Sequence, residues 1–549
     1  MKDYTKKQKI LIILGVAVFI LIGSGLTYAA LTWATSNPIN IGLTSGCFEI
    51  NYTPGGAINN ANVEVMNEST LISNNKFTIT DGIALTYANI GIKSTCTIEG
   101  YGSLYLNVTS LSSAFSTGSS KGSLKYAILN NTSNSTTLTV AGLKGQSFDI
   151  VKKGTITSTG TINILNKQLS NTVQNKYLIV FYIDGSKIGN DVIGASFAGN
   201  ISADAHQGTA PINTVELLTE LYTNAVKTAT ALDSVTYNLA SSVGLMNDRN
   251  GSSSVGVDAG NIRYYGANPN NYIYFNCSNY KLQSSSTCEI WRIIGIVDGK
   301  MKIIRSSSIG SYSWDNKNTD TGAETVYGKN DWTTARLMKL LNPSDYYTAD
   351  NNDSGNGQSL YWTAQSGTCF SGQDNATTSC NFTSTGLKNA ITKNLIAETT
   401  YYTRGHSSPS IYVGVIYDKE RVSGTVYTGR PTSWTGKVAI PYPSDYGYAA
   451  DLSLCQQTLN NYNDETCTTN NWMYNVITNN GTYYSWLLTP YVGNTSYMGD
   501  AWHVIESGKV NSNGTGYFAD GVTPVLYLNS SVSIKSGSGT SSDPYQLSV

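Results

Sequence analysis

Cysteine is the residue type whose spacing points most directly to chemistry. The chain has eight cysteines, all of which lie beyond an apolar N-terminal segment. They fall into three close pairs and one longer-range pair: Cys277/Cys288, Cys369/Cys380, Cys455/Cys467 and Cys47/Cys96. An even, locally paired set is typical of disulfides formed in an oxidising compartment. Zinc is the alternative, but zinc ligands usually stand about two to four residues apart, much closer than these pairs.

Catalysis needs a base that titrates near neutral pH or an activated nucleophile. The only histidines are His206, His406 and His503, and none stands in a recognisable catalytic motif. Metalloprotease, serine-hydrolase, phosphate-binding and dinucleotide-binding motifs are absent from the sequence. The nearby acids Asp418 and Glu420 fit a solvated turn. We therefore expect no catalytic residues, with a carbohydrate-active or protein-modifying enzyme as the minor alternative.

One loop presents the hard oxygen ligands that calcium prefers. It contains Asp350, two asparagines, Asp353, Ser354 and Gly355. An EF-hand would have glutamate at the twelfth position, which is Tyr361 in this chain. The sequence therefore predicts a solvated loop and no cofactor or metal, with calcium as the alternative.

Tyrosine is frequent, with 38 in the chain, and several tyrosines cluster amid Ser, Asn and Gly. In antibody paratopes this mixture makes adaptable contacts at low entropy cost. The alternative is codon bias of an AT-rich genome, with many tyrosines packed in strands. Because it contains Pro443 and follows Pro441, the segment 442–448 is expected to form an exposed loop. The candidate ligand-binding residues, of which the last is also a core candidate, are Trp434, Tyr442, Tyr446, Tyr448, Tyr491, Tyr497 and Trp502.

The N-terminus has the pattern of an export signal. Residues 1–9 carry four lysines and one aspartate, and residues 10–22 contain no polar side chain. Two interpretations stay open, because the apolar character continues to residue 33: a signal-anchor helix at 10–33 with residues 1–9 in the cytoplasm, or a signal peptide cleaved near Ala29 or Ala30. Both predict a protein on the extracellular face of the membrane or secreted.

Charge excludes one class of partner. Only 13% of the residues are charged and the formal net charge is −1. No basic stripe is available to neutralise phosphates, so we expect no nucleic-acid binding.

The rest of the chain divides into three predicted regions. Residues 37–207 alternate short apolar strands with polar turns, as at 48–52, 76–79, 103–108 and 177–183, which predicts an all-β sandwich. Residues 211–260 are predicted to be a helical connector, capped by Asn213 or Thr214, followed by a loop from residue 241. Residues 261–549 are predicted to be an α+β domain, with a two-residue hairpin turn at 298–299 and helices at 333–341 and 387–397.

Several motifs of the third region resemble a known group. They begin at Tyr264 (YYGANPNNYIYF), Trp291 (WRIIGI), Asn330 (NDWTTARL), Trp486 (WLLTP) and Gly521 (GVTPVLYL). Their order resembles uncharacterised surface domains of Firmicutes and, at fold level, the C-type-lectin-like folds of formylglycine-generating enzymes and retroelement-diversified proteins. Each cysteine has a plausible disulfide partner, so the resemblance does not imply the reactive cysteines of those enzymes.

The N-terminal layout of lysines, apolar run and β-rich domain is similar to exported matrix-fibre or camelysin-like proteins of Gram-positive bacteria. The combined hypothesis is a multidomain, non-enzymatic, adhesin-like surface protein. Its expected partners are an extracellular glycan or protein ligand and, through the N-terminal helix, a membrane. The alternative is a structural envelope or matrix-fibre component that self-assembles through the β-sandwich.

Overall fold

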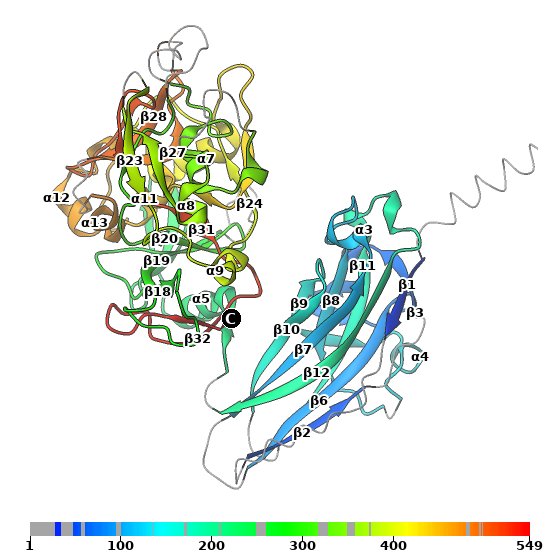
Figure 1. Ribbon diagram of the computed structural model, residues 1–549. Coiled ribbons are helices and arrows are strands. Elements are labelled where there is room, and N and C mark those ends of the chain that lie inside the picture. Colours follow the sequence, from blue (N-terminus) through cyan, green and yellow to red (C-terminus); the bar gives the residue numbers. More distant parts are fainter. Residues whose placement is uncertain are drawn as a thin grey trace, which may run out of the picture. The chain divides into compact units, whose positions relative to one another are not determined.

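The computed structural model (Figure 1) describes two compact units, Met1–Ala210 and Pro211–Val549. The described residues are 28–33, 48–55, 61–94, 100–135, 137–169, 173–207, 210–248, 260–316, 328–348, 357–372, 375–478, 484–493, 496 and 498–548.

The first unit is a sandwich-like β structure, as the sequence predicts. Its strands, in the order in which they pair, are β10 (Gly160–Leu169), β7 (Gly100–Leu111), β12 (Ser196–Gln207), β1 (Tyr28–Trp33), β3 (Ala61–Met66), β11 (Gln174–Asp184), β8 (Leu124–Asn130), β9 (Ser147–Thr155), β5 (Lys76–Thr78) and β4 (Ile72–Ser73), while β6 (Ala84–Ser94) pairs with both β11 and β2 (Phe48–Pro54). Its short helical turns are α2 (Glu68–Leu71), α3 (Ser113–Ser116), α4 (Val140–Leu143), η1 (Gly185–Lys187) and η2 (Asn190–Val192).

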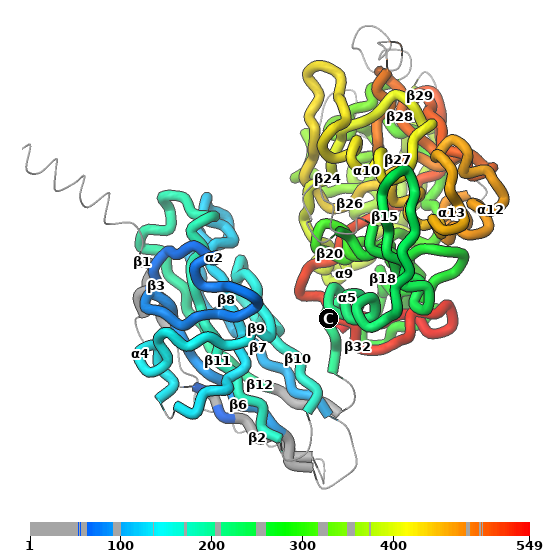
Figure 2. Tube along the Cα trace, turned by 180° about the vertical axis from the view of Figure 1, so that it is seen from behind, coloured from blue at the N-terminus to red at the C-terminus, as the bar shows by residue number. Residues whose placement is uncertain are grey.

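Strand β11 is the centre of this unit. Its residues 177–183 are apolar without alternation, which is the pattern of a strand buried on both faces. Ile179 and Phe181 belong to one hydrophobic core, whereas Leu178 and Val180 belong to a second core on the opposite face. Figure 2 shows the segments of α2 and α4 over this second face, where Leu71 and Leu143 are buried.

Strand β1 corrects the predicted extent of the N-terminal helix. Residues 28–33 pair in parallel with β12 and antiparallel with β3, so they are an extended part of the sheet. The predicted span of 10–33 is therefore too long, and cleavage near Ala29 or Ala30 would cut inside a strand. Residues 1–27 lie outside the described part of the chain. Among the described residues, no helix is long and apolar enough to cross a membrane.

The second unit combines several sheets with short helices. The largest sheet contains β14 (Thr228–Leu232), β15 (Val235–Ala240), β16 (Leu245–Asn247), β17 (Ile262–Tyr264), β19 (Glu289–Val297), β20 (Lys300–Arg305), β31 (Val525–Tyr527) and β26 (Val438–Ala439), with β18 (Tyr272–Phe275) beside β19. A second sheet contains β21 (Ser311–Tyr312), β30 (Asp520–Gly521), β27 (Tyr484–Pro490), β28 (Asp500–Ile505) and β29 (Val510–Gly514). Smaller sheets are β13 (Ile212–Asn213) with β32 (Ser533–Ser536) and β33 (Gln546–Ser548), β22 (Ser366–Phe370) with β23 (Thr377–Asn381), and β24 (Thr399–Tyr402) with β25 (Ser433–Gly436).

The helical segments of the second unit are short. They are α5 (Thr214–Asn224), α7 (Arg336–Leu341), α8 (Leu360–Thr363), α9 (Ala390–Leu395), α10 (Val413–Asp418), α11 (Pro443–Tyr448), α12 (Glu465–Thr469), α13 (Trp472–Thr478), η3 (Ser344–Tyr346), the π-helical turn η5 (Lys419–Ser423) and η6 (Leu459–Asn461). Helices α7 and α9 lie inside the two predicted helical ranges. The predicted hairpin is also present, with positive φ at Asp298 (51°) and Gly299 (74°), as its two-residue turn requires.

The predicted connector is part of the second unit and not a separate region. Helix α5 begins after Asn213, whose side chain accepts a hydrogen bond from Val215 N at 3.0 Å. Leu218 of α5 is buried in the main core, and Ile212 pairs with Ile534 of β32. The predicted loop also contains β16. Figure 1 shows α5 and β32 at the end of the unit opposite β28, so the beginning and the end of this unit lie side by side.

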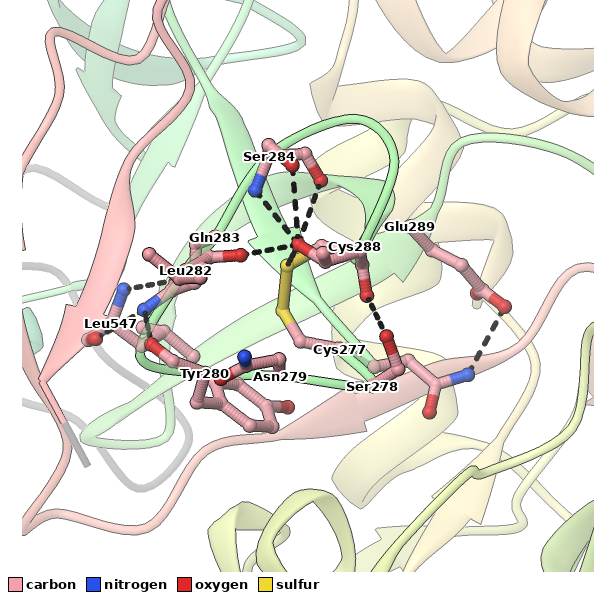
Figure 3. The surroundings of a disulfide bond; sticks show 12 residues. Cys277, Ser278, Asn279, Tyr280, Leu282, Gln283, Ser284, Cys288, Glu289 and Leu547 are labelled. Atoms are coloured by element: carbon pink, nitrogen blue, oxygen red, sulfur yellow. Dashed lines mark hydrogen bonds between the residues drawn. A yellow bond between two sulfur atoms is a disulfide. The ribbon is translucent and has the colours of Figure 1, made fainter.

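Three of the four predicted disulfides are confirmed, Cys277–Cys288, Cys369–Cys380 and Cys455–Cys467. Cys47 and Cys96 lie outside the described residues. Figure 3 shows how the loop of the first disulfide is held: the Gln283 amide donates to Leu547 O at 2.6 Å and accepts from Leu547 N at 2.8 Å. This loop is therefore tied to β33 as well as closed by its own disulfide.

Candidate functional site

The aromatic residues predicted to contact a ligand are mostly buried. Their exposed fractions are 7% for Trp434, 1% for Tyr442, 0% for Tyr446, 1% for Tyr448 and 0% for Trp502. Tyr491 is half-buried, and Tyr497 lies outside the described residues.

The expected exposed loop at 442–448 is wrong, because this segment forms helix α11, and all six of its residues are buried. Pro443 stands at the first helical position, where its missing N–H costs nothing. The same prolines that indicate a loop are therefore compatible with a helix start. Tyr446 packs against Tyr462, and its hydroxyl donates to Gly508 O at 2.8 Å.

Around these tyrosines lies a buried charge cluster, which we define as Arg263, Lys302, Arg421, Asp248, Glu420 and Asp445. All six side chains are at most 4% exposed. Arg263 bridges Asp248 (2.7 Å) and Asp445 (3.0 Å), and Lys302 Nζ lies 2.5 Å from Asp445 Oδ2. Arg421 donates to Glu420 at 2.9 Å. Three cations thus face three acids within the core.

Tyrosine rings replace water around these buried cations. Lys302 Nζ lies 4.6 Å from the centre of the Tyr442 ring, and the Arg263 guanidinium lies 4.8 Å from that of Tyr448. Arg421 stacks on Tyr417 at 3.9 Å. Cation–π attraction is strongest where water is excluded. The local tyrosine enrichment therefore serves the interior here and does not mark a contact surface.

Two acids of the cluster have displaced pKa values. Burial alone would raise the pKa of Asp445, but Lys302 and Arg263 outweigh burial and hold it at about 2. Burial dominates at Glu420 and raises its pKa to about 7, although Arg421 and Ser444 favour the ionised form. Glu420 is 0% exposed, so the expectation of a solvated acid is wrong for this residue.

This shift predicts a pH-dependent stability. The pKa of Glu420 is raised from 4.5 to about 7, so its favourable contribution is complete below pH 4.5 and is lost as the pH rises through 7. The expected loss in the free energy of unfolding is roughly 3 kcal/mol. Urea unfolding between pH 4.5 and 8 measures this effect. The free energy of unfolding should fall less with rising pH for Glu420→Gln than for wild type. The control is Glu506→Gln, at an exposed position, whose stability should change with pH as the wild type does. An equal change of unfolding free energy with pH in Glu420→Gln and wild type would contradict the prediction.

A small hollow, whose enclosed space of about 10 Å³ holds roughly one water molecule, is the candidate ligand site. Four chain segments line it: Asn330–Trp332, Thr403, the loop from Val426 to Pro431, and the end of β27 at Pro490 with Val492. The Asn330 amide joins two of its walls by donating to Tyr491 O at 2.9 Å and to Asp500 O at 2.5 Å.

Side chains with hydrogen-bonding groups and rings are among the residues that line the hollow. The buried residues Asp331, Thr403 and Arg430 contribute a carboxylate, a hydroxyl and a guanidinium. Arg430 is held by a 3.0 Å bond to Met498 O and lies 4.9 Å from the ring of half-buried Tyr427. Such convergence of a few polar groups with aromatic rings is typical of ligand sites.

Trp332 is the aromatic residue at the core side of the hollow. It is 1% exposed, and its indole Nε1 has no hydrogen-bond acceptor among the described residues. A buried donor without an acceptor costs free energy, which an acceptor from a ligand or a water would offset. Trp332 also packs edge-on against Trp314 at 5.2 Å and Trp434 at 6.3 Å.

Only part of the predicted residue set lies near this hollow. Trp434 contacts its wall through Trp332, and Tyr491 lies between two lining residues. Trp502 does not line the hollow but is connected to it through His406. Its Nε1 donates to His406 O, and His406 forms a β-bridge with Tyr491. The lining residues Asp331, Trp332, Thr403, Tyr427 and Arg430 were not predicted from the sequence. The motif beginning at Asn330 is the one signal that could have indicated two of them.

The histidines have different surroundings. His503 lies in strand β28, where its Nδ1 is 2.8 Å from Asp520 Oδ2 and its ring stacks on Tyr484 at 5.4 Å. Burial, with Lys419 nearby, lowers the pKa of half-buried His406. His206 is placed only as part of strand β12.

Among the described residues, no group of three or more His, Cys, Asp or Glu side chains is arranged to hold a metal ion. The predicted calcium loop, residues 350–355, lies outside those residues. A second, larger hollow of about 340 Å³ is lined by α5 and Ala225 with Ser242 and Val243. Its walls are mainly half-buried apolar side chains, without the convergent polar groups of the first hollow.

Comparison with known proteins adds no assignment: no family model matches the chain, and no curated protein is detectably similar to it.

Proposed function

We propose that this protein is an exported, non-enzymatic binding protein of the cell surface, whose second unit binds a hydroxyl-rich glycan end group at the hollow next to Trp332. The observation that carries the proposal is the convergence of Asp331, Thr403, Tyr427 and Arg430 beside the unpaired Trp332 indole N–H. Export is supported by the three disulfides, which form and persist in oxidising compartments.

The chemistry of the hollow favours a saccharide. Carboxylate and guanidinium groups bind sugar hydroxyls directionally, and aromatic rings pack against the apolar face of a sugar. The enclosed space of the hollow is about 10 Å³, room for roughly one water molecule, so a ligand would rest at its mouth. One hydroxyl of a sugar residue at the end of a chain matches this size.

Binding should depend on Tyr427. We expect Tyr427→Ala to weaken binding of a glycan found by array screening of the oxidised full chain by about tenfold or more, since it removes a ring and a hydroxyl from the wall. The measurement is calorimetric titration with that glycan. The matched control is Tyr517→Ala, because Tyr517 is 39% exposed and does not line the hollow.

Near-ultraviolet circular dichroism of both variants establishes that they are folded. A folded Tyr427 variant with wild-type affinity would remove the hollow from the binding site. Equal losses in both variants would indicate an indirect effect. No binding by the folded wild type to any glycan would count against the saccharide.

Self-assembly through the first unit is the second candidate. Strand β10 is ten residues long and pairs only with β7 among the described strands, so it is an edge strand of the sheet. Such edges are templates for pairing with another chain. Light scattering of the full chain tests this candidate: concentration-dependent polymers would support a structural layer or fibre, and a monomer at micromolar concentration would count against it.

A further inference from the structure

Lys302 and Asp445 form the most enclosed ion pair of the second unit. Both side chains are 0% exposed, and Lys302 Nζ lies 2.5 Å from Asp445 Oδ2. Lys302 belongs to central strand β20, whereas Asp445 belongs to helix α11, which lies far from it in the sequence. An amine and a carboxyl group are thus held in contact in a site without water access.

The surroundings fix both reacting groups. Asp445 Oδ1 accepts from Arg263 Nη1 at 3.0 Å, and Oδ2 accepts from Tyr442 N at 3.0 Å. The rings of Tyr442 and Tyr527 lie 4.6 Å and 5.3 Å from Lys302 Nζ. Groups held in contact react with a higher effective molarity than free groups, because less entropy is left to lose.

Charge balance in the cluster singles out this pair. Arg263 has Asp248 as a second partner at 2.7 Å, and Arg421 has Glu420 at 2.9 Å. If Lys302 and Asp445 became neutral together, Arg263 would still face Asp248, and Arg421 would still face Glu420 and, at 3.8 Å, Asp298. Because burying an ion pair carries a large desolvation penalty, removing one pair of charges from this core is favourable.

We propose that Lys302 and Asp445 condense into an intramolecular isopeptide bond between Nζ and Cγ. This proposal is independent of the proposed glycan binding. It assigns a covalent modification that joins β20 to α11, and with them two distant segments of the second unit.

The step balances without another reactant. The nitrogen lone pair of Lys302 attacks Cγ of Asp445, a C–N bond forms and the Cγ–Oδ2 bond breaks. The ammonium loses two protons to Oδ2, which leaves as water, so that an ammonium and a carboxylate yield an amide and one water molecule. No electrons are transferred and no external acid is consumed.

Two features of the site assist this step. Burial lowers the pKa of Lys302, in spite of Asp445, and so favours the neutral nucleophilic amine. Arg263 is a positioning residue: its N–H on Oδ1 withdraws electron density from Cγ and stabilises the negative oxygen of the tetrahedral intermediate.

Peptide mass mapping of the reduced and alkylated full chain tests the proposal. We expect a branched tryptic peptide in which the segment containing Lys302 is joined to the segment containing Asp445, with a mass one water below the sum of the two. Trypsin should not cleave after Lys302, because its amine is acylated. Cleavage there, together with two separate unmodified peptides, would overturn the proposal.

Variants separate the cross-link from other losses of water. Lys302→Met should yield an unmodified Asp445 peptide, whereas Lys300→Met, two positions earlier on the same strand, should retain the branched peptide. Succinimide formation at Asp298–Gly299 also removes one water, but within a single linear peptide. The peptide map of the wild type shows whether the cross-link is present even if Lys302→Met fails to fold.

Discussion

Asp445→Ala is expected to lower the free energy of unfolding of the second unit by about 3–5 kcal/mol. The substitution removes the acid that Arg263 and Lys302 share, at 3.0 Å and 2.5 Å, and leaves two cations less compensated in the core. It also removes the acceptor of the Tyr442 backbone N–H at the start of α11. If the proposed isopeptide forms, the same substitution abolishes it, so the expected direction is unchanged.

Urea unfolding of the full chain at pH 7 measures this effect, with near-ultraviolet signals reporting on the tryptophan-rich second unit. The matched control is Asp345→Ala, in the exposed turn η3, which should change stability by less than about 0.5 kcal/mol. A similarly small change for Asp445→Ala would contradict the role assigned to the buried charge cluster.

The pH dependence of an ionised Asp445 has the opposite sign to that of Glu420. Its pKa is lowered from 3.8 to about 2, so its contribution is present above pH 3.8 and is lost as the pH falls through 2. The expected loss is about 2 kcal/mol. An isopeptide at this position would remove the titration altogether, so acid unfolding compared between wild type and Asp445→Ala gives a second test of the cross-link.

Trp502→Ala is expected to destabilise the second unit by about 3–5 kcal/mol, the usual cost of truncating a buried tryptophan. The side chain is 0% exposed, and its indole N–H donates to His406 O at 3.2 Å. The variant loses core packing within β28 and also the link to the segment next to Tyr491. Thermal and urea unfolding measure the loss.

A control at an exposed aromatic residue distinguishes the effect of burial on stability from the effect of losing an aromatic ring. Phe518 is 40% exposed, so Phe518→Ala should cost far less than Trp502→Ala. Glycan affinity, corrected for the folded fraction, should stay near the wild-type value in the Trp502 variant, because Trp502 does not line the hollow. A large loss of affinity in fully folded Trp502→Ala would restore this residue to the contact set.

Local patterns were the reliable part of the sequence. The three close cysteine pairs form disulfides, and Asp298–Gly299 makes the two-residue turn between β19 and β20. The apolar run at 177–183 is a central strand. In each case the partners or neighbours are close in sequence, or the burial of the strand on both faces is encoded in its own composition.

Patterns that depend on distant partners were misread. Aromatic and proline content at 442–448 indicated a loop, but burial there is decided by Lys302, Arg421 and Gly508, which come from other segments. Residues 28–33 continue an apolar run, yet they pair with β3 and β12. The connector helix α5 belongs to the second unit because Leu218 enters its core.

By itself, the sequence determined the β-rich first unit, the three close disulfides, the hairpin and the places of helices α5, α7 and α9, because these depend on neighbours in the chain. Only the tertiary structure decided which tyrosines face buried cations, which acid serves Arg263 and Lys302, and which four segments line the hollow. Side-chain type limits what a residue can bind, but the partner of a long-range contact is selected by packing. Arg263 and Asp445 lie 182 residues apart, and no pattern within either segment specifies their meeting.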